Sequence, residues 1–322
     1  MTKMQKTVRA SPSWFTRFWA VVRYEMLWNI RKKKFIAALI IAFVLATVDL
    51  AVPAFLNVGQ NPYFAATFSG GSFTFFLFGI VTAMNSISGE YESGTIVPLL
   101  AKPVSRTMVF FGKLFATFIV ILVSYIVIFS YSTIGGLLVY GPQNSLYLVP
   151  LALVGDIIST FIWVAVVLAA GCISKSSLLA LLTALGLFIS LFLGVSVVAA
   201  FSGNAGVVGG LNYLPGAGAS GTMNVTAGQS ATIANVTVNT LTSVSSGTDS
   251  IGANMVKAVL FPNASVLFTH TNVLSNPIGP PTLLYTESIS LIILRAIGVA
   301  FLYIAVFLLI AWYAFKRSQI LE

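Results

Sequence analysis

The sequence predicts an all-α membrane protein that crosses the bilayer several times. The chain of 322 residues has a mean hydropathy of +0.96 and only 8% charged residues, whereas soluble proteins carry about 25%. A helix needs about 20 apolar residues to span the roughly 30 Å hydrocarbon core. We expect six such spans, at 35–58, 63–88, 107–139, 146–173, 177–201 and 287–315. The apolar runs are too long, and alternate too little, for the strands of a membrane β-barrel.

The first 34 residues are expected to form an N-terminal region with its own interfacial helix. The stretch WFTRFWAVVRYEMLWNI at 14–30 mixes aromatic and aliphatic residues with Arg17, Arg23 and Glu25, which is typical of an amphipathic elbow helix. The RKKK that follows fixes the start of the first span, either as part of this elbow or only as a topology signal. No cleavable signal peptide is expected, because no uninterrupted apolar segment precedes residue 35.

The distribution of Lys and Arg predicts the orientation of the spans. With the N-terminus inside, fifteen of the 17 basic residues fall in cytoplasmic segments, while Lys257 falls outside and Arg295 within a helix. Because basic residues mark the cytoplasmic side, we expect a multi-pass protein of the plasma membrane with both termini cytoplasmic. The net charge of +9 is then explained by membrane lipids with anionic headgroups, and no nucleic-acid partner is expected.

This orientation divides the chain into four parts. They are a cytoplasmic N-terminus with the elbow helix at 1–34, spans one to five at 35–201, a large external segment at 202–286, and the last span with a short cytoplasmic tail at 287–322.

A charged segment, ISGEYESGTIVPLLAKPVSR at 87–106, joins the second and third spans. We expect a short amphipathic element at 89–106, because Gly94 permits a bend and two prolines stiffen the return. Ser105 is expected to cap the third span. The segment is too short to build an active site, so it acts on a partner or is only a solvated loop.

The sequence GEYESGTIVPLLAKPVSRTMVFFGK at 89–113 resembles the loop pattern of ABC transporter permeases of the type-2, exporter-like class. The order of a basic N-terminus, six spans, an insertion before the last span and a basic ending is similar to that class over nearly the whole chain. The resemblance implies a coupling helix that docks on a separate ATPase subunit. The residues expected at this contact are Glu90, Tyr91, Glu92, Gly94, Thr95 and Arg106. The resemblance also implies a second permease chain, in a homo- or heterodimer, and ATP with magnesium bound by the partner subunit.

The chain's own residues indicate no catalytic or nucleotide site. The only Gly-Lys pair, Gly112 and Lys113, is followed by Leu114, so no phosphate-binding P-loop motif occurs. No Ser, His and Asp set or paired carboxylate suggests catalysis, and the lone His270 has no neighbours at metal-ligand spacing. We therefore expect no catalytic residue, no metal and no cofactor in this chain.

The external segment changes sharply in composition to Gly, Ser, Thr, Asn and Val. Residues 225–241 have β-strand composition with partial alternation, and 254–261 are consistent with a short helix. Three sequons, at Asn224, Asn235 and Asn263, permit glycosylation without requiring it.

Three charged residues lie deep within the spans, where charge is costly and marks pairing or function. Asp49, Asp156 and Arg295 lie eight to ten residues from the expected outer ends of their spans, so they share one layer roughly 12 to 15 Å deep. We expect Arg295 to pair with one or both aspartates, either to lock helices together or as part of a substrate path or gate.

The function that the resemblance implies is ATP-driven export, and the largely apolar spans favour an amphipathic or lipid-like substrate. An alternative is a secondary transporter or channel without an ATPase partner, for which broken helices, inverted repeats or more intramembrane charges are expected. A lipid-modifying enzyme is a further alternative, and it would need catalytic residues near a membrane face.

Overall fold

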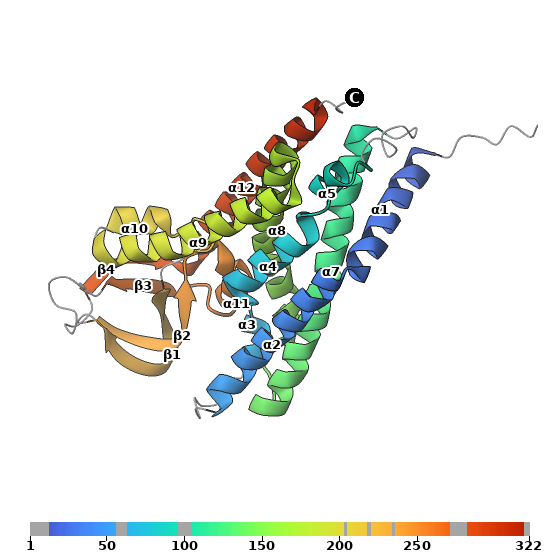
Figure 1. Ribbon diagram of the computed structural model, residues 1–322. Coiled ribbons are helices and arrows are strands. Elements are labelled where there is room, and N and C mark those ends of the chain that lie inside the picture. The colour runs from blue at the N-terminus through green and yellow to red at the C-terminus, as the bar shows by residue number, and fades with distance from the viewer. Residues whose placement is uncertain are drawn as a thin grey trace, which may run out of the picture.

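The computed structural model describes residues 13–55, 63–95, 105–202, 205–217, 220–233, 236–270 and 282–318, and every structural statement below refers to these residues. A bundle of long helices carries a small β-sheet at one side (Figure 1). Six helical stretches are long and apolar enough to cross a membrane, and one of them, 71–92, consists of two helices joined by a turn. The predicted fold class, an all-α polytopic membrane protein with an insertion that contains β-strands, is confirmed.

The bundle is built from nine helices of the described chain. They are α1 (Trp14–Arg31), α2 (Lys33–Phe55), α3 (Phe64–Thr67), α4 (Gly71–Ala83), α5 (Ser88–Glu92), α7 (Arg106–Tyr140), α8 (Val149–Ser174), α9 (Ser177–Ser202) and α12 (Ile289–Arg317), with the short 3-10 turn η1 (Leu146–Leu148) before α8. We call the end of the bundle with α1, α5 and the last turn of α12 the terminal end, and the opposite end the sheet end (Figure 1).

Helix α1 packs along the first half of α7, as Figure 1 shows. Ser13 caps α1 by accepting a hydrogen bond from the Thr16 amide at 3.2 Å. A Cβ at Gly112 of α7 would lie 2.9 Å from Val21 Cγ1, so the glycine allows the two helices to approach closely. The helix predicted at 14–30 is confirmed. Its buried residues are Val22, Glu25 and Asn29, whereas most of its aromatic side chains are exposed.

The second expected span, 63–88, is not one continuous helix. Residues 68–70 separate α3 from α4, and Gly71 has a φ of 72°, in the left-handed region that favours glycine. A turn after Ala83 then separates α4 from α5. The prediction of an unbroken helix was wrong because its apolar composition hid two adjacent glycines, Gly70 and Gly71, at the start of α4.

The other spans begin and end within a few residues of the expected positions. Ser105 caps α7 by accepting from the Met108 amide at 3.2 Å, as predicted. Helix α8 lies in the middle of the bundle, where its fully buried Trp163 contacts the ring of Phe76, with ring centroids 5.1 Å apart. A Cβ at Gly79 would lie only 2.6 Å from Trp163 Cβ, so α4 lies very close to α8.

Between α9 and α12 the chain forms what we call the sheet unit. It contains α10 (Ala205–Leu211), β1 (Ser220–Ile233), β2 (Val236–Ser245), the 3-10 turn η2 (Thr248–Ser250), α11 (Ile251–Leu260), β3 (Ser265–His270) and β4 (Thr282–Ser288). The four strands are antiparallel in the order β2-β1-β3-β4. The β-strands expected within 225–241 and the helix expected at 254–261 are therefore confirmed.

The three sequons fall in different surroundings. Asn224 lies in β1, Asn263 lies exposed in the turn that follows α11, and Asn235 lies outside the described residues. Their glycosylation stays a prediction.

The sheet unit is not a separate lobe, because η2 and α11 pack directly on α8. Gly155 of α8 and Gly252 of α11 face each other so closely that a Cβ on either would meet the backbone of the other helix. Ser159 of α8 also donates a 2.6 Å hydrogen bond to the Thr248 carbonyl. Movement of the sheet unit and movement of α8 are therefore mechanically linked.

Candidate functional site

A pocket of about 1030 Å³ opens at the terminal end of the bundle, between α1, α5 and the first turns of α7. We call it the junction pocket. Its wall is amphipathic, with aromatic and aliphatic side chains from α1 and polar side chains from α5. The lining residues are Arg17, Ala20, Val21, Tyr24, Glu25, Trp28, Lys34, Asn85, Gly89, Glu90, Glu92, Ser93, Thr95, Val109, Lys113 and Ser177.

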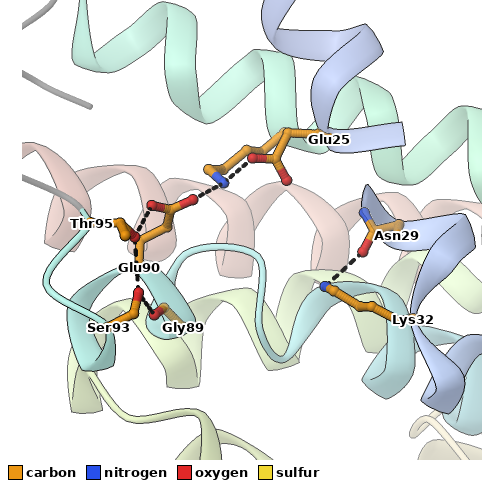
Figure 2. A network of polar contacts seen from close by, with 8 residues as sticks. Glu25, Asn29, Lys32, Gly89, Glu90, Ser93 and Thr95 are labelled. Atoms are coloured by element: carbon orange, nitrogen blue, oxygen red, sulfur yellow. Dashed lines mark hydrogen bonds and ion pairs between the residues drawn. The ribbon is translucent and has the colours of Figure 1, made fainter. Parts of the chain in front are cut away.

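A buried ion cluster lies in the wall of this pocket. Lys113 of α7 forms ion pairs with Glu25 of α1 and, at 3.0 Å, with Glu90 of α5. The side chains of Lys113, Glu25 and Glu90 are 2%, 4% and 16% exposed, so water screens their attraction only weakly. Figure 2 shows Glu25 and Glu90 pointing toward the same ammonium group from opposite sides. Three segments far apart in the sequence are thereby tied together.

The position of Glu25 follows from the helical repeat of α1. Its buried residues, Val22, Glu25 and Asn29, are spaced by three and four positions and so share one face. Two of these three residues are polar, so the buried face of α1 carries a polar stripe that meets Lys113. Sequence reasoning treated Glu25 only as part of an amphipathic pattern and missed this stripe. The signal was a carboxylate on the apolar face of α1 together with a lysine inside the third span.

Lys32 lies between α1 and α2 and adds a second ammonium group beside the ion cluster. Its Nζ donates to Asn29 Oδ1 at 2.9 Å (Figure 2). The same Nζ lies 3.4 Å above the Trp28 ring. Burial lowers the pKa of Lys32 to about 8, against the opposing influence of the Glu25 and Glu90 carboxylates. Lys113, Lys32, Glu25 and Glu90 together supply two ammonium groups and two carboxylates, so these four groups are neutral as a set when all are ionised.

The loop that follows α5 is shaped by short-range hydrogen bonds. Thr95 donates to the second oxygen of Glu90 at 2.6 Å, and Ser93 donates to the Gly89 carbonyl at 2.7 Å (Figure 2). Gly94 has a φ of 68°, and a Cβ there would meet nothing within 4 Å. Glycine is therefore needed at this position for its backbone conformation and not for space.

Glu92 ties α5 to a different helix. It accepts hydrogen bonds from the Ser177 amide at 2.8 Å, from the Ser176 hydroxyl at 2.9 Å and from the Ser177 hydroxyl. These donors lie at the N-terminus of α9, where the unpaired amides and the helix dipole favour a negative charge. A carboxylate on α5 thus caps a membrane helix.

Tyr91 and Arg106, two further residues expected at the coupling segment, bond to the C-terminal end of α12. The hydroxyls of Tyr91 and Ser318 are hydrogen-bonded to each other. Arg106 Nη1 donates to the carbonyls of Lys316 and Ser318, at 3.1 and 2.8 Å. These carbonyls have no partner within the helix, which makes them suitable acceptors for a basic side chain.

All six residues expected at the coupling segment therefore lie together at the terminal end, but the side chains of five of them have partners within the chain. The middle of the segment, 96–104, lies outside the described residues. Whether Glu90, Glu92 and their neighbours contact a second protein stays a prediction. What the geometry adds is a role in fixing the orientation of α5.

The prediction that Arg295 pairs with Asp49 or Asp156 was wrong. Arg295 pairs with Glu287, at the end of β4. Asp156 is fully buried and accepts from the Gly70 amide at 3.1 Å and the Ser69 hydroxyl at 3.5 Å. Asp49 lies on the exposed side of α2. The prediction failed because Glu287 was counted as the first residue of the last span. In the structure it lies in β4, the strand that leads directly into α12.

The sequence of the chain shows which family these helices and this pocket belong to. The sequence profile of a family described as ABC-2 family transporter protein matches residues 19–320. The chain belongs to this family. A search of curated proteins gave no match. The chain is thus the membrane subunit of an ABC transporter, in a family whose permeases generally dimerise and work with an ATPase subunit. The match covers α1 from Trp19 onward, which places most of this helix within the family's shared region.

Proposed function

We propose that the chain is the permease of an ATP-driven exporter and that a separate ATPase subunit docks at the junction pocket, with ATP and magnesium bound in that subunit. The observation that supports the proposal is the position of the pocket. It opens beside α5, in the segment that resembles a coupling helix, and it is bordered by the buried Glu25–Lys113–Glu90 cluster. In this proposal both termini are cytoplasmic, as the Lys and Arg distribution predicts.

The contacts of α5 suggest how a partner's movement would reach the membrane helices. Glu90 is tied to α7 through Lys113, which also pairs with Glu25 of α1. Tyr91 is tied to the end of α12 and Glu92 to the start of α9. A displacement of α5 would therefore act on the terminal ends of three spans at once. Such a rigid connection is what conversion of ATP turnover into a change of helix packing requires.

The kind of substrate is inferred from the bundle. Buried charges such as the Lys113 cluster and Asp156 are bonded to protein groups, so they are engaged in the structure and not available to a highly charged cargo. Long apolar faces of α2, α9 and α12 are exposed in the single chain. We propose an amphipathic or lipid-like substrate, moved between two permease chains whose apolar faces contact each other and the surrounding lipid.

Site-directed cross-linking tests the docking site. In a background in which Cys172 is replaced, Ser93→Cys places a thiol on the exposed loop after α5, and Tyr147→Cys places one on η1 at the sheet end, where the tyrosine is 75% exposed. The complex is purified from native membranes and treated with a short bifunctional reagent. We expect a cross-link from Ser93→Cys to an ATPase subunit and none from the matched Tyr147→Cys control.

Reconstitution of the purified complex then tests the activity. Transport that needs hydrolysable ATP, with the cross-link at Ser93→Cys, supports the proposal. A chain that purifies without an ATPase and supports ion flux by itself would instead indicate the channel or secondary-transporter alternative.

A further inference from the structure

Two carboxylates are buried where the sheet unit packs on the membrane bundle. Asp156 of α8 is 0% exposed and Asp249 of η2 is 6% exposed. The side chain of Asp156 lies directly against Gly252, three residues beyond Asp249 in the sequence. We call this contact, formed by α8 with η2 and the start of α11, the α8 joint. It belongs to neither the junction pocket nor the Lys113 cluster.

The two carboxylates differ in how well they are satisfied. Asp156 accepts hydrogen bonds from the Gly70 amide and the Ser69 hydroxyl, at the start of α4. Asp249 has no hydrogen-bond partner at either carboxylate oxygen within the described part of the chain. The Ser72 hydroxyl, the Gly216 amide and the Thr248 hydroxyl lie close enough to lower its pKa, but none of them makes a hydrogen bond of normal geometry to it, and burial is the larger influence. A buried, ionised carboxylate without donors is strongly disfavoured.

The charges that face Asp249 do not compensate for it. Among the described residues, the titratable groups that share its electrostatic environment are Asp156 on α8 and Tyr125 on α7. No Lys, Arg or His side chain of the described chain acts on either carboxylate. No group of three His, Cys, Asp or Glu side chains that could hold a metal ion occurs there either. The ligand that this arrangement favours is a proton.

We propose that Asp249 is a proton-binding site, and that the proton it takes up under mildly acidic conditions holds the sheet unit against α8. A neutral carboxylic acid removes the desolvation cost of a buried charge. An ionised Asp249 restores this cost and loosens the joint. Because the sheet unit is joined to α8 by the Gly155–Gly252 contact and by Ser159, the change reaches a helix in the middle of the bundle.

The sign of the pH dependence follows from linkage. Burial raises the pKa of Asp249 from 3.8 to about 6, so between these values the folded joint holds more protons than the opened one. Its stability is then greatest below about pH 4 and is lost as the pH rises through about 6. Between about pH 5 and about pH 7.5, the equilibrium constant for opening should rise about tenfold.

Hydrogen–deuterium exchange of the full-length chain in lipid nanodiscs tests the proposal. After correction for the intrinsic pH dependence of exchange, amides of α11 should become about tenfold less protected between about pH 5 and about pH 7.5. Asp249→Asn, which is neutral at both values, should abolish the change. Asp49→Asn, which removes a carboxylate on the exposed side of α2, is the matched control and should preserve it.

Two results would overturn the proposal. One is a protection of α11 that stays the same across this pH range in the unmodified chain. The other is a pH dependence that persists in Asp249→Asn. If that variant does not fold, infrared spectroscopy of the unmodified chain decides instead: a carboxylic acid carbonyl band must disappear as the pH rises through about 6, and a constant band rejects the site.

Discussion

Replacing Lys113 with methionine tests whether the buried ion cluster holds the terminal end together. Methionine keeps most of the apolar stem of lysine but removes the ammonium group. In the described chain, the ion-pair partners of both Glu25 and Glu90 are this one group. The change therefore leaves two carboxylates in a region that water barely reaches.

The size of the effect can be worked out from burial and charge. Removing one partner of a buried ion pair typically costs about 3 to 5 kcal/mol, because an uncompensated charge remains in a poorly solvated place. That range applies here, since Lys113 and Glu25 are 2% and 4% exposed. With Lys32 nearby, the cluster changes from neutral to one net negative charge. We expect the free energy of unfolding of Lys113→Met to fall by about 3 kcal/mol or more.

A second substitution makes the reasoning specific. In the Lys113→Met background, Glu25→Gln leaves Lys32 and Glu90 as one positive and one negative charge. This second substitution should therefore restore part of the lost stability, even though it removes the Glu25 carboxylate. Lys33→Met, on the exposed first turn of α2, is the matched control and should change stability by less than about 0.5 kcal/mol. The measurement is thermal or denaturant unfolding in lipid nanodiscs, arranged as a double-mutant cycle. A Lys113→Met protein as stable as the unmodified chain, or a double variant less stable than the single one, would refute the argument.

Three further predictions concern packing, pH and topology. Gly155→Ala should cost about 1 to 3 kcal/mol in thermal unfolding because its Cβ would overlap the backbone of α11, whereas Gly186→Ala, with open space around it, should be neutral or slightly stabilising. Because burial lowers the pKa of Lys32 to about 8 from 10.5, stability should rise as the pH increases between these values, and Lys32→Met should lose this rise in a pH titration of unfolding. In a background without the native cysteine, Asn263→Cys should react with an impermeant thiol reagent on intact cells and Arg317→Cys should not; the reverse pattern would contradict the predicted orientation.

The six spans and several of their ends could be predicted because they depend on local sequence. A run of about 20 apolar residues must satisfy its backbone as a helix wherever it lies in the membrane. Likewise Ser105 caps α7 through its own hydroxyl and an amide three residues later. The break within the second expected span was missed, although Gly70 and Gly71 stood in the sequence, because glycine is common within membrane helices and its φ is set by packing.

The ion cluster could not be predicted because its members meet only through tertiary packing. Glu25 and Lys113 are 88 residues apart in sequence, and nothing local shows that α1 docks on α7 with its polar stripe inward. The predicted pairing of Arg295 with an aspartate was wrong for the same reason, because ion pairs within a bundle depend on tertiary packing. The depth of a charge within a span is a one-dimensional property, and it does not determine which side chain the charge faces. Glu287 is close to Arg295 because β4 leads directly into α12.

The arrangement at α5 explains why so short a helix can carry the proposed coupling. A helix of five residues is not stable by itself, so its orientation depends on the groups that hold its side chains. Successive residues of a helix point about 100° apart, and Glu90, Tyr91 and Glu92 are consecutive, so their ties leave α5 in three directions, toward α7 with α1, α12 and α9. A helix held in three directions cannot rotate or slide alone. Force applied to it is therefore shared among the helices that hold it, and the length of α5 limits its own stability but not its ability to transmit movement.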